Sequence, residues 1–249
     1  MVRRLPLSSI LIVLFSLAST NLQAQSWQSG LIVTYDWFRA YGAFPAYTVG
    51  QYRLLARPSS VDEGFHLGLW GQRSLGRDAR WFVRPELTYS GGPVHTTYEN
   101  TAPFVYMEPD DYRTWNDFFT IGDSLRLNRL NTSLSAGRRF GRVHASAGPV
   151  LSYRFRTASE RDTFTYRSRI IDAVEASTRR WGLAAQVSAG VELGRVQVGL
   201  RYERSLADLS TNLLFDGQRY DFRRYSQLWS LTTAVRLYPW RVAKQVKQP

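Results

Sequence analysis

Few residues in this 249-residue chain have the types and spacing needed for covalent catalysis. The segment His144-Ala-Ser146 places a histidine and a serine two positions apart, and we expect Glu192 on a neighbouring strand. A serine hydrolase needs these three groups within hydrogen-bond reach and open to substrate. The chain has no Gly-x-Ser-x-Gly turn to present a nucleophile. We therefore interpret the three as packing residues, whose strand positions point into an interior.

A metal or cofactor site is not indicated either, and we expect none. The chain has no cysteine, which excludes thiolate sites. Residues 104–119, FVYMEPDDYRTWNDFF, contain four carboxylates whose oxygens could gather a calcium ion: Glu108, Asp110, Asp111 and Asp117. Their spacing does not match an EF-hand. We expect a solvated acidic loop, whose aromatic side chains could also bind a glycan or a protein.

The segments that hold these side chains alternate between apolar and polar residues. This alternation fills residues 181–193 and 196–203, on either side of the tripeptide Leu-Gly-Arg. Related tripeptides, Phe-Gly-Arg at 140–142 and Leu-Gly-Arg at 75–77, are also flanked by alternating segments. Alternation over such lengths indicates two-faced β-strands, and glycine supplies the positive φ of a tight turn. We therefore predict three hairpins.

The lengths of the connections indicate how the hairpins assemble. Strands at 30–38 and 225–238 bring the count to eight. The connections outside the three glycine turns are long: 39–63, 92–124, 158–179 and about 210–223. Because short and long connections alternate, all the long ones lie on one side of the sheet. This arrangement predicts an all-β fold, an eight-stranded antiparallel up-and-down transmembrane β-barrel.

The direction in which each set of side chains points separates a membrane barrel from a soluble one such as a lipocalin. The polar set is rich in Gly, Ser, Gln, Arg and Glu, which suits a hydrated interior better than an outer surface. An eight-stranded barrel is just wide enough for its side chains, and an unpaired buried charge is costly. We expect a lumen salt-bridge network of Arg84, Glu86, Arg139, Arg154, Glu192, Arg201, Glu203 and Arg236. The alternative for this arginine-rich lumen is an anion path.

Two further patterns concern the membrane surface. Aromatic residues of the apolar set lie near predicted strand ends, as an interfacial girdle requires. These residues are Trp37, Trp81, Tyr89, Tyr153, Trp181, Tyr202 and Trp229. Residues 170–176, IIDAVEA, predict a short helix lying at the interface.

The ends of the chain indicate export. Residues 1–24 begin with basic residues, contain an apolar run at 10–18 and end in Ala24, which predicts a cleaved signal peptide. The apolar run is too short to span a bilayer. We expect the barrel domain at 25–240 and a short periplasmic tail at 241–249. The net charge of +12 does not indicate a nucleic-acid partner, because export removes the chain from nucleic acid and the basic residues are spread along it.

Three segments carry a family resemblance: FVRPELTYSGG (82–92), ASAGPVLSYRF (145–155) and WGLAAQVSAGVELGRVQVGLRYERSLADL (181–209). They resemble the outer-membrane β-barrel domain family that includes PorT-like proteins, over essentially the whole mature chain. The resemblance implies the bacterial outer membrane as location and a part in a secretion apparatus as a role. The His-x-Ser pair with a carboxylate is similar to outer-membrane lipid A deacylases, which are also eight-stranded barrels.

We therefore expect an outer-membrane protein with a structural, adhesive or secretion/assembly-partner role, exerted through long extracellular loops, and not an enzyme. Its expected partners are outer-membrane lipid and a protein or glycan at the loops. Two alternatives stay open: a lipid-modifying enzyme that uses His144, Ser146 and Glu192, and a small pore.

Overall fold

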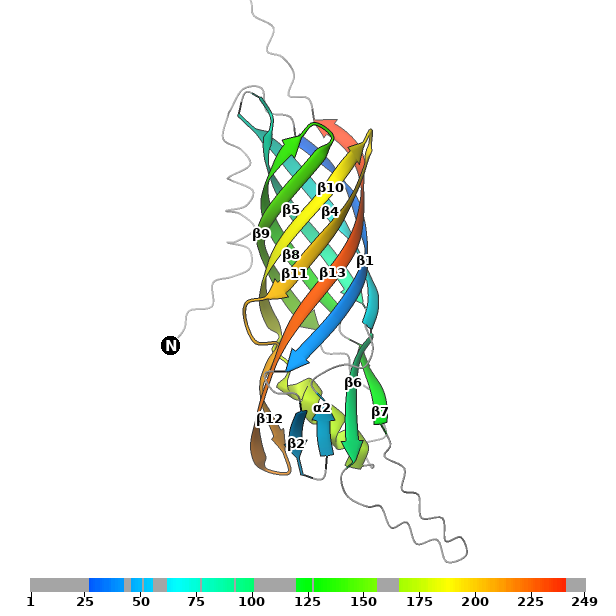
Figure 1. Cartoon of the computed structure of the whole chain (residues 1–249), viewed down its shortest axis with the longest axis vertical. Helices are drawn as coiled ribbons and strands as arrows, with labels where there is room; N and C mark the ends of the chain where they lie inside the picture. The colour runs from blue at the N-terminus through cyan, green and yellow to red at the C-terminus, as the bar shows by residue number, and fades with distance from the viewer. Residues whose placement is uncertain are drawn as a thin grey trace, which may run out of the picture.

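Eight strands of this protein close into an antiparallel barrel, as the sequence predicts (Figure 1). The computed structural model describes residues 27–42, 46–50, 52–55, 62–76, 78–91, 93–100, 120–126, 128–155 and 166–240. The strands follow one another around the wall in chain order, and the first pairs with the last. The predicted fold class is therefore confirmed.

Each barrel strand has at least the roughly nine residues that cross a bilayer at a tilt. The barrel strands are β1 (Trp27–Gly42), β4 (Asp62–Leu75), β5 (Trp81–Gly91), β8 (Asn128–Phe140), β9 (Val143–Phe155), β10 (Trp181–Leu193), β11 (Val196–Ser205) and β13 (Gln218–Trp240). All eight predicted strands are present. Several are longer than predicted, because hydrogen bonds to both neighbours extend the regular ladder beyond the alternating core of each segment.

The glycines of the three tripeptides lie in the short turns of the barrel. Gly76, Gly141 and Gly194 have φ values of 76°, 67° and 65°, a conformation that other residues adopt only with strain. The β8–β9 and β10–β11 turns lie together at the upper end of the barrel in Figure 1. In membrane barrels the short turns face the periplasm and the long connections face outward. We name the two ends of the barrel accordingly.

The wall of the barrel has an apolar outside and a largely polar inside. Leu200 is 54% exposed on the outer face, whereas Glu86 is 4% exposed on the inner face. The same alternation runs along β1, β5, β8 and β9. The lumen also holds two small apolar clusters. They consist of Ile32, Trp70 and Ala234, and of Phe38, Ala40, Leu209 and Leu228.

The long connections contain regular structure of their own, which the sequence analysis treated as loops. A four-stranded antiparallel sheet has the order β2–β3–β6–β7. Its strands are β2 (Ala46–Val49), β3 (Tyr52–Leu55), β6 (Pro93–Asn100) and β7 (Thr120–Arg126). In addition, β12 (Ser210–Phe215) pairs with the first residues of β13, and α2 (Tyr166–Ser177) lies beside it (Figure 1). Together these elements form an extracellular cap.

The cap has an apolar core outside the barrel. Its buried members are Tyr47, Val49, Leu54, Ile170, Val174, Leu213, Phe215 and Phe222, from β2, β3, α2, β12 and β13. The prediction of a helix at 170–176 was right, but its predicted place was wrong. Ile170 and Val174 are buried in the cap core rather than laid on a membrane surface. The apolar face of α2 packs against β12 and is therefore buried by protein rather than by lipid.

Several sequence predictions fall outside the described residues. They include the signal peptide at 1–24, the tail at 241–249, and the four acidic residues of the 104–119 loop. Within the described part of the chain, no helix has the length and apolar character needed to cross a membrane.

Candidate functional site

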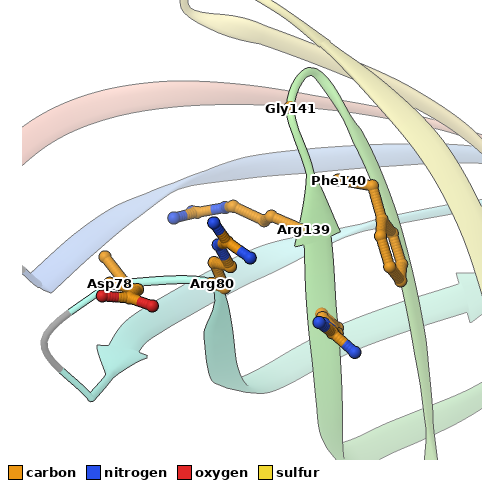
Figure 2. Close-up of a pocket in the computed structure, with 7 residues that line it drawn as sticks. Asp78, Arg80, Arg139, Phe140 and Gly141 are labelled. Atoms are coloured by element: carbon orange, nitrogen blue, oxygen red, sulfur yellow. The ribbon is translucent and has the colours of Figure 1, made fainter.

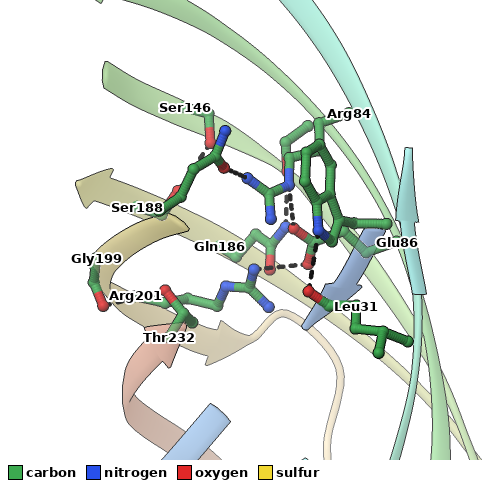
Figure 3. Close-up of polar contacts among 12 residues, drawn as sticks. Leu31, Arg84, Glu86, Ser146, Gln186, Ser188, Gly199, Arg201 and Thr232 are labelled. Carbon is green, nitrogen blue, oxygen red and sulfur yellow. Dashed lines mark hydrogen bonds and ion pairs between the residues drawn. The ribbon is translucent and has the colours of Figure 1, made fainter. Parts of the chain in front are cut away.

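The centre of the lumen is crossed by a buried ion-pair cluster around Glu86 (Figure 3). Its carboxylate forms an ion pair with Arg84, whose Nε lies 2.7 Å away, and accepts a hydrogen bond from Arg201 Nη2 at 2.6 Å. β5 and β11, which carry Glu86 and Arg201, are four places apart in a ring of eight, so they form opposite walls. The pair therefore spans the full width of the lumen. Each charge is satisfied by the other, which is the condition for burying both.

A second cluster lies toward the periplasmic end, around Glu192. Arg139 Nε donates to this carboxylate at 3.0 Å, and Arg236 Nη2 lies 3.6 Å away. The Gln197 amide joins the two clusters, because it accepts from Arg84 at 2.7 Å and donates to Glu192 at 3.3 Å. Strands β5, β8, β10, β11 and β13 are thus linked by polar contacts across the interior as well as by backbone ladders.

A third cluster fills the extracellular half of the lumen. Arg129 lies 3.8 Å from Glu203 and donates to Ser90 at 2.9 Å. The Arg129 guanidinium is 3.3 Å from His66 Nε2, which in turn is 2.7 Å from Asp36. The sequence analysis missed Arg129. Arg129 lies two positions before the inward-facing Asn131, so the two-residue period of a strand would have placed it inside as well.

The eight predicted network residues differ in their partners. Seven of them form ion pairs within 4.0 Å: Arg84, Glu86, Arg139, Glu192, Arg201, Glu203 and Arg236. Arg154 is buried but, among the described residues, has no carboxylate partner and donates to the Arg179 carbonyl at 2.7 Å. Gly182 makes room for it, since a β-carbon there would lie 2.8 Å from Arg154 Nη2.

Arg224 is a further buried arginine that the sequence analysis missed. It lies where β13 pairs with β12, beyond the membrane-spanning part of the strand. Its guanidinium donates to Ser210 Oγ at 2.9 Å and to Thr178 Oγ1 at 3.1 Å. Burial lowers the pKa of Arg224 to about 10. The side chain joins the cap to the mouth of the barrel by hydrogen bonds, with no ion pair to another described residue.

The three catalytic candidates are not arranged for hydrolysis. Ser146 Oγ is 2.8 Å from Ser188 Oγ (Figure 3). The His144 ring is buried and lies edge-on to Phe82, with ring centroids 6.2 Å apart. Glu192 is held by Arg139 and Gln197 rather than by an imidazole. The required relay from carboxylate to histidine to serine is therefore not formed between these residues.

No group of three or more metal-ligating side chains occurs in the described part of the chain. The acidic loop considered as a calcium site lies outside that part.

The predicted interfacial aromatics lie on the outer face in cross-strand rows. Trp37 pairs with Trp229 and Trp229 pairs with Tyr202, with 4.8 Å between the centroids of the second pair. A cavity of about 370 Å³ lies on this row, lined by Trp37, Arg39, Tyr41, Gln227 and Trp229. Tyr153 and Trp181 also pair, with centroids 4.8 Å apart, and Tyr89 lies at the same end. Trp81 marks the opposite, periplasmic end, where Phe140 joins it.

The outer face between these rows is the feature that fixes the environment of the barrel. Leucine and valine side chains are exposed around the wall, including Leu69, Leu87, Leu134, Leu151, Val187, Leu200 and Leu231. An apolar surface of this kind is stable against hydrocarbon, and a closed barrel leaves no unpaired backbone edge there. This is a membrane-spanning barrel. Barrels of this architecture belong to bacterial outer membranes, which is the predicted location.

Comparison with known proteins adds only distant similarities. No family model matches the chain, and no curated protein matches it. Among solved structures, OprG from Pseudomonas aeruginosa is 11% identical, with a TM-score of 0.38, covering 85% of this chain and 97% of that one. The outer membrane protein AlkL, solved in lipid bilayers, is 11% identical, with a TM-score of 0.44, covering 99% and 100%. These similarities do not bear on function.

Proposed function

We propose that this protein is a closed outer-membrane anchor that presents a folded cap to the outside, where it serves in adhesion or as an assembly partner. The observation that carries the proposal is the Glu86–Arg201 pair across the lumen, which leaves the barrel as a support rather than a channel. The resemblance to PorT-like proteins adds a secretion apparatus as the assembly that the cap would join.

The cap supports a role in recognition. A purely structural barrel has no need of an apolar core outside the membrane, whereas a folded cap holds a binding surface in fixed shape. Leu214, on β12, is 67% exposed although it lies in the cap and not against lipid. An exposed apolar side chain of this size on a water-facing element is compatible with contact to a protein partner.

Site-specific photocrosslinking tests the assembly role. A photoreactive residue at Leu214 should form crosslinks to protein in native cells, because this position faces outward from the cap. The same residue at Leu200, on the lipid face, is the matched control and should form none. Protein crosslinks absent from both positions would contradict an assembly partner at the cap.

Planar-bilayer recording tests the closed lumen. We expect no conductance steps from the purified protein, because the ion pairs around Glu86 and Glu192 occupy the interior. Reproducible steps that disappear on heat denaturation would favour the pore instead.

The proposal also excludes catalysis by the lumen serine. Because Ser146 bonds to Ser188 and has no relay to Glu192, Ser146→Ala should leave the lipid A profile of cells unchanged. A profile that differs between the wild type and Ser146→Ala would favour the enzyme.

A further inference from the structure

The outer face of the barrel has three polar side chains just outside one of its extracellular aromatic rows. That aromatic row consists of Trp37 on β1, Trp229 on β13 and Tyr202 on β11. Two residues nearer the cap on each strand, the same register pairs Arg39 with Gln227 and Gln227 with Arg204. We call these three residues the outer polar row.

All members of the outer polar row lie on the same side of the barrel wall. Arg39 and Arg204 are exposed, and Gln227 is half-buried. A residue next to each of them along its strand is buried: Phe38, Glu203 and Leu228. Because successive side chains of a strand point to opposite faces, the row faces outward, as the tryptophans below it do.

A cavity of about 370 Å³ lies where the outer polar row meets the aromatic row. It is lined by Trp37, Arg39, Tyr41, Gln227 and Trp229, which all belong to the outer face of β1 and β13. A single molecule in this cavity therefore meets a cation, an amide and aromatic rings. Arg204 lies on the next strand, about 5 Å further along the wall than Gln227.

The two arginines are not neutralised by the described part of the barrel. Neither Arg39 nor Arg204 forms an ion pair with another described residue. Glu63 lies on the same face, but on β4, on the other side of β1 from Gln227. There it accepts a hydrogen bond from the Tyr35 hydroxyl. The outer polar row thus presents two positive charges to its surroundings.

The row belongs to one wall and is not a girdle around the barrel. β9 lies opposite β1 in the ring of eight strands. Two residues outside Tyr153 on β9, the outer face carries the exposed Phe155 rather than an arginine. The pair of arginines is therefore a local feature of the surface of β1, β13 and β11.

The level of the row in the membrane indicates its occupant. Aromatic side chains at the end of the apolar band mark where hydrocarbon meets lipid headgroups, so the next residues outward lie among the headgroups. At the extracellular end of an outer-membrane barrel, these headgroups are the phosphorylated glucosamines of lipid A, the glycolipid of the outer leaflet. Such headgroups are anionic, and the row is cationic.

We propose that the cavity and the outer polar row bind the phosphorylated sugar headgroup of lipid A. Arg39 and Arg204 bind phosphate, since the planar guanidinium matches phosphate oxygens in a two-pronged geometry. Gln227, between them, bonds to sugar hydroxyls. The rings of Trp37 and Trp229 cover the apolar side of the sugar. The acyl chains continue along the exposed wall formed by Leu31, Leu200 and Leu231.

The periplasmic end has a comparable position in the other leaflet. Arg138 lies there on the outer face, with its guanidinium 5.4 Å from the centre of the Trp81 ring and 5.1 Å from that of Phe140. Arg138 and Phe140 also line a cavity of about 430 Å³ at the end of β8 (Figure 2). This arginine beside aromatic rings faces the phospholipid leaflet, so the thickness of the membrane separates it from lipid A.

The lipid A that copurifies with the full-length protein tests the proposal. The wild type and its variants are extracted from outer membranes in mild detergent, and lipid A per protein is measured by mass spectrometry. We expect R39Q/R204Q to retain about tenfold less than the wild type, because two charge-assisted contacts to phosphate are lost. R138Q, the matched control in the other leaflet, should retain as much as the wild type.

A competition measurement separates lipid A from other lipids that carry phosphate. Wild-type protein stripped of lipid in detergent is loaded with lipid A and titrated with phosphatidylglycerol. We expect displacement only at a large excess, because phosphatidylglycerol has no sugar ring to lie against Trp37 and Trp229.

Three results would overturn the proposal. The first is equal retention of lipid A by R39Q/R204Q and the wild type. The second is an equal loss in R138Q and R39Q/R204Q, which would show an effect of net charge alone. The third is displacement by equimolar phosphatidylglycerol, which would identify a general anion site. The shift of unheated protein on denaturing gels shows that each variant is folded. The site lies on the barrel wall, so the outcome does not depend on the function proposed for the cap.

Discussion

The lumen and the cap bury side chains by opposite rules, although they are parts of one chain. In the lumen, most buried positions are polar, including Arg84, Glu86 and Arg201, while most leucines of the barrel wall face outward. In the cap, Leu213 and Phe222 are buried, as in a water-soluble domain. The difference follows from the surroundings, because lipid removes the penalty for exposing apolar groups and water restores it. Exposing a leucine therefore costs little free energy on the lipid-facing wall but is unfavourable in the cap, which is surrounded by water.

The largest effect is expected from removing the central carboxylate of the lumen. Glu86→Gln keeps the shape but leaves Arg84 and Arg201 buried without a counter-ion, which should cost about 3–5 kcal/mol of unfolding free energy. Urea unfolding of the protein in lipid vesicles measures this change. Ser146→Ala, also in the lumen, removes no charge and serves as the control. A loss below about 1 kcal/mol would show that the pairs are no stronger than surface salt bridges.

Truncating a cap leucine should have an effect almost as large, but a local one. Leu213→Ala leaves a cavity in the cap core and should cost about 2–5 kcal/mol there. Limited proteolysis should cut the cap while the barrel keeps its shifted mobility on gels. Leu200→Ala on the lipid face is the matched control, because acyl chains fill the space that it leaves. Equal loss in both variants would remove the distinction between the two regions.

Replacing an exposed leucine by a charged residue distinguishes a lipid-facing position from a water-facing one, because only the lipid-facing charge is strongly destabilising. Leu200→Arg places a charge on the lipid face and should cost about 2–4 kcal/mol. Leu214→Arg, on the exposed surface of the cap, should change stability by less than about 0.5 kcal/mol. Urea unfolding of the two variants gives the comparison. If both variants unfold at the wild-type midpoint, the apolar outer face does not contact hydrocarbon.

A small effect is also expected at Arg224, where cap and barrel meet. Arg224→Met loses two hydrogen bonds but also removes a buried charge without an ion-pair partner among the described residues, so stability should stay within about 1 kcal/mol of the wild type.

The pH dependence of Arg224 follows from its lowered pKa of about 10, against an unfolded value of 12.5. Between these two values the unfolded state holds more protons than the folded one, so this group adds stability as pH rises. The wild type should therefore gain stability relative to Arg224→Met as the pH is raised through about 10. A difference that stays constant with pH would contradict the burial of a charged guanidinium.

Much of the barrel could be predicted from local patterns. Alternation assigned Glu86 and Leu200 to opposite faces, because strand side chains repeat every two residues whatever their partners. The glycine tripeptides indicated the short turns, and the lengths of the connections indicated which end of the barrel carries the long ones. The cap was missed, since its strands β2 and β3 have only four residues each and carry no clear period. The helix α2 was seen, but not what its apolar face contacts.

The sequence by itself therefore determined the order of the strands, which side chains point into the lumen, and which charged residues the lumen contains. These features depend on neighbours along the chain. Only the tertiary structure decided which charges meet. Glu86 and Arg201 are 115 positions apart and touch because closure places their strands on opposite walls. Arg139 and Glu192, 53 positions apart, likewise meet only in the closed barrel. Contacts of this kind depend on strand register and ring closure, which no local pattern records.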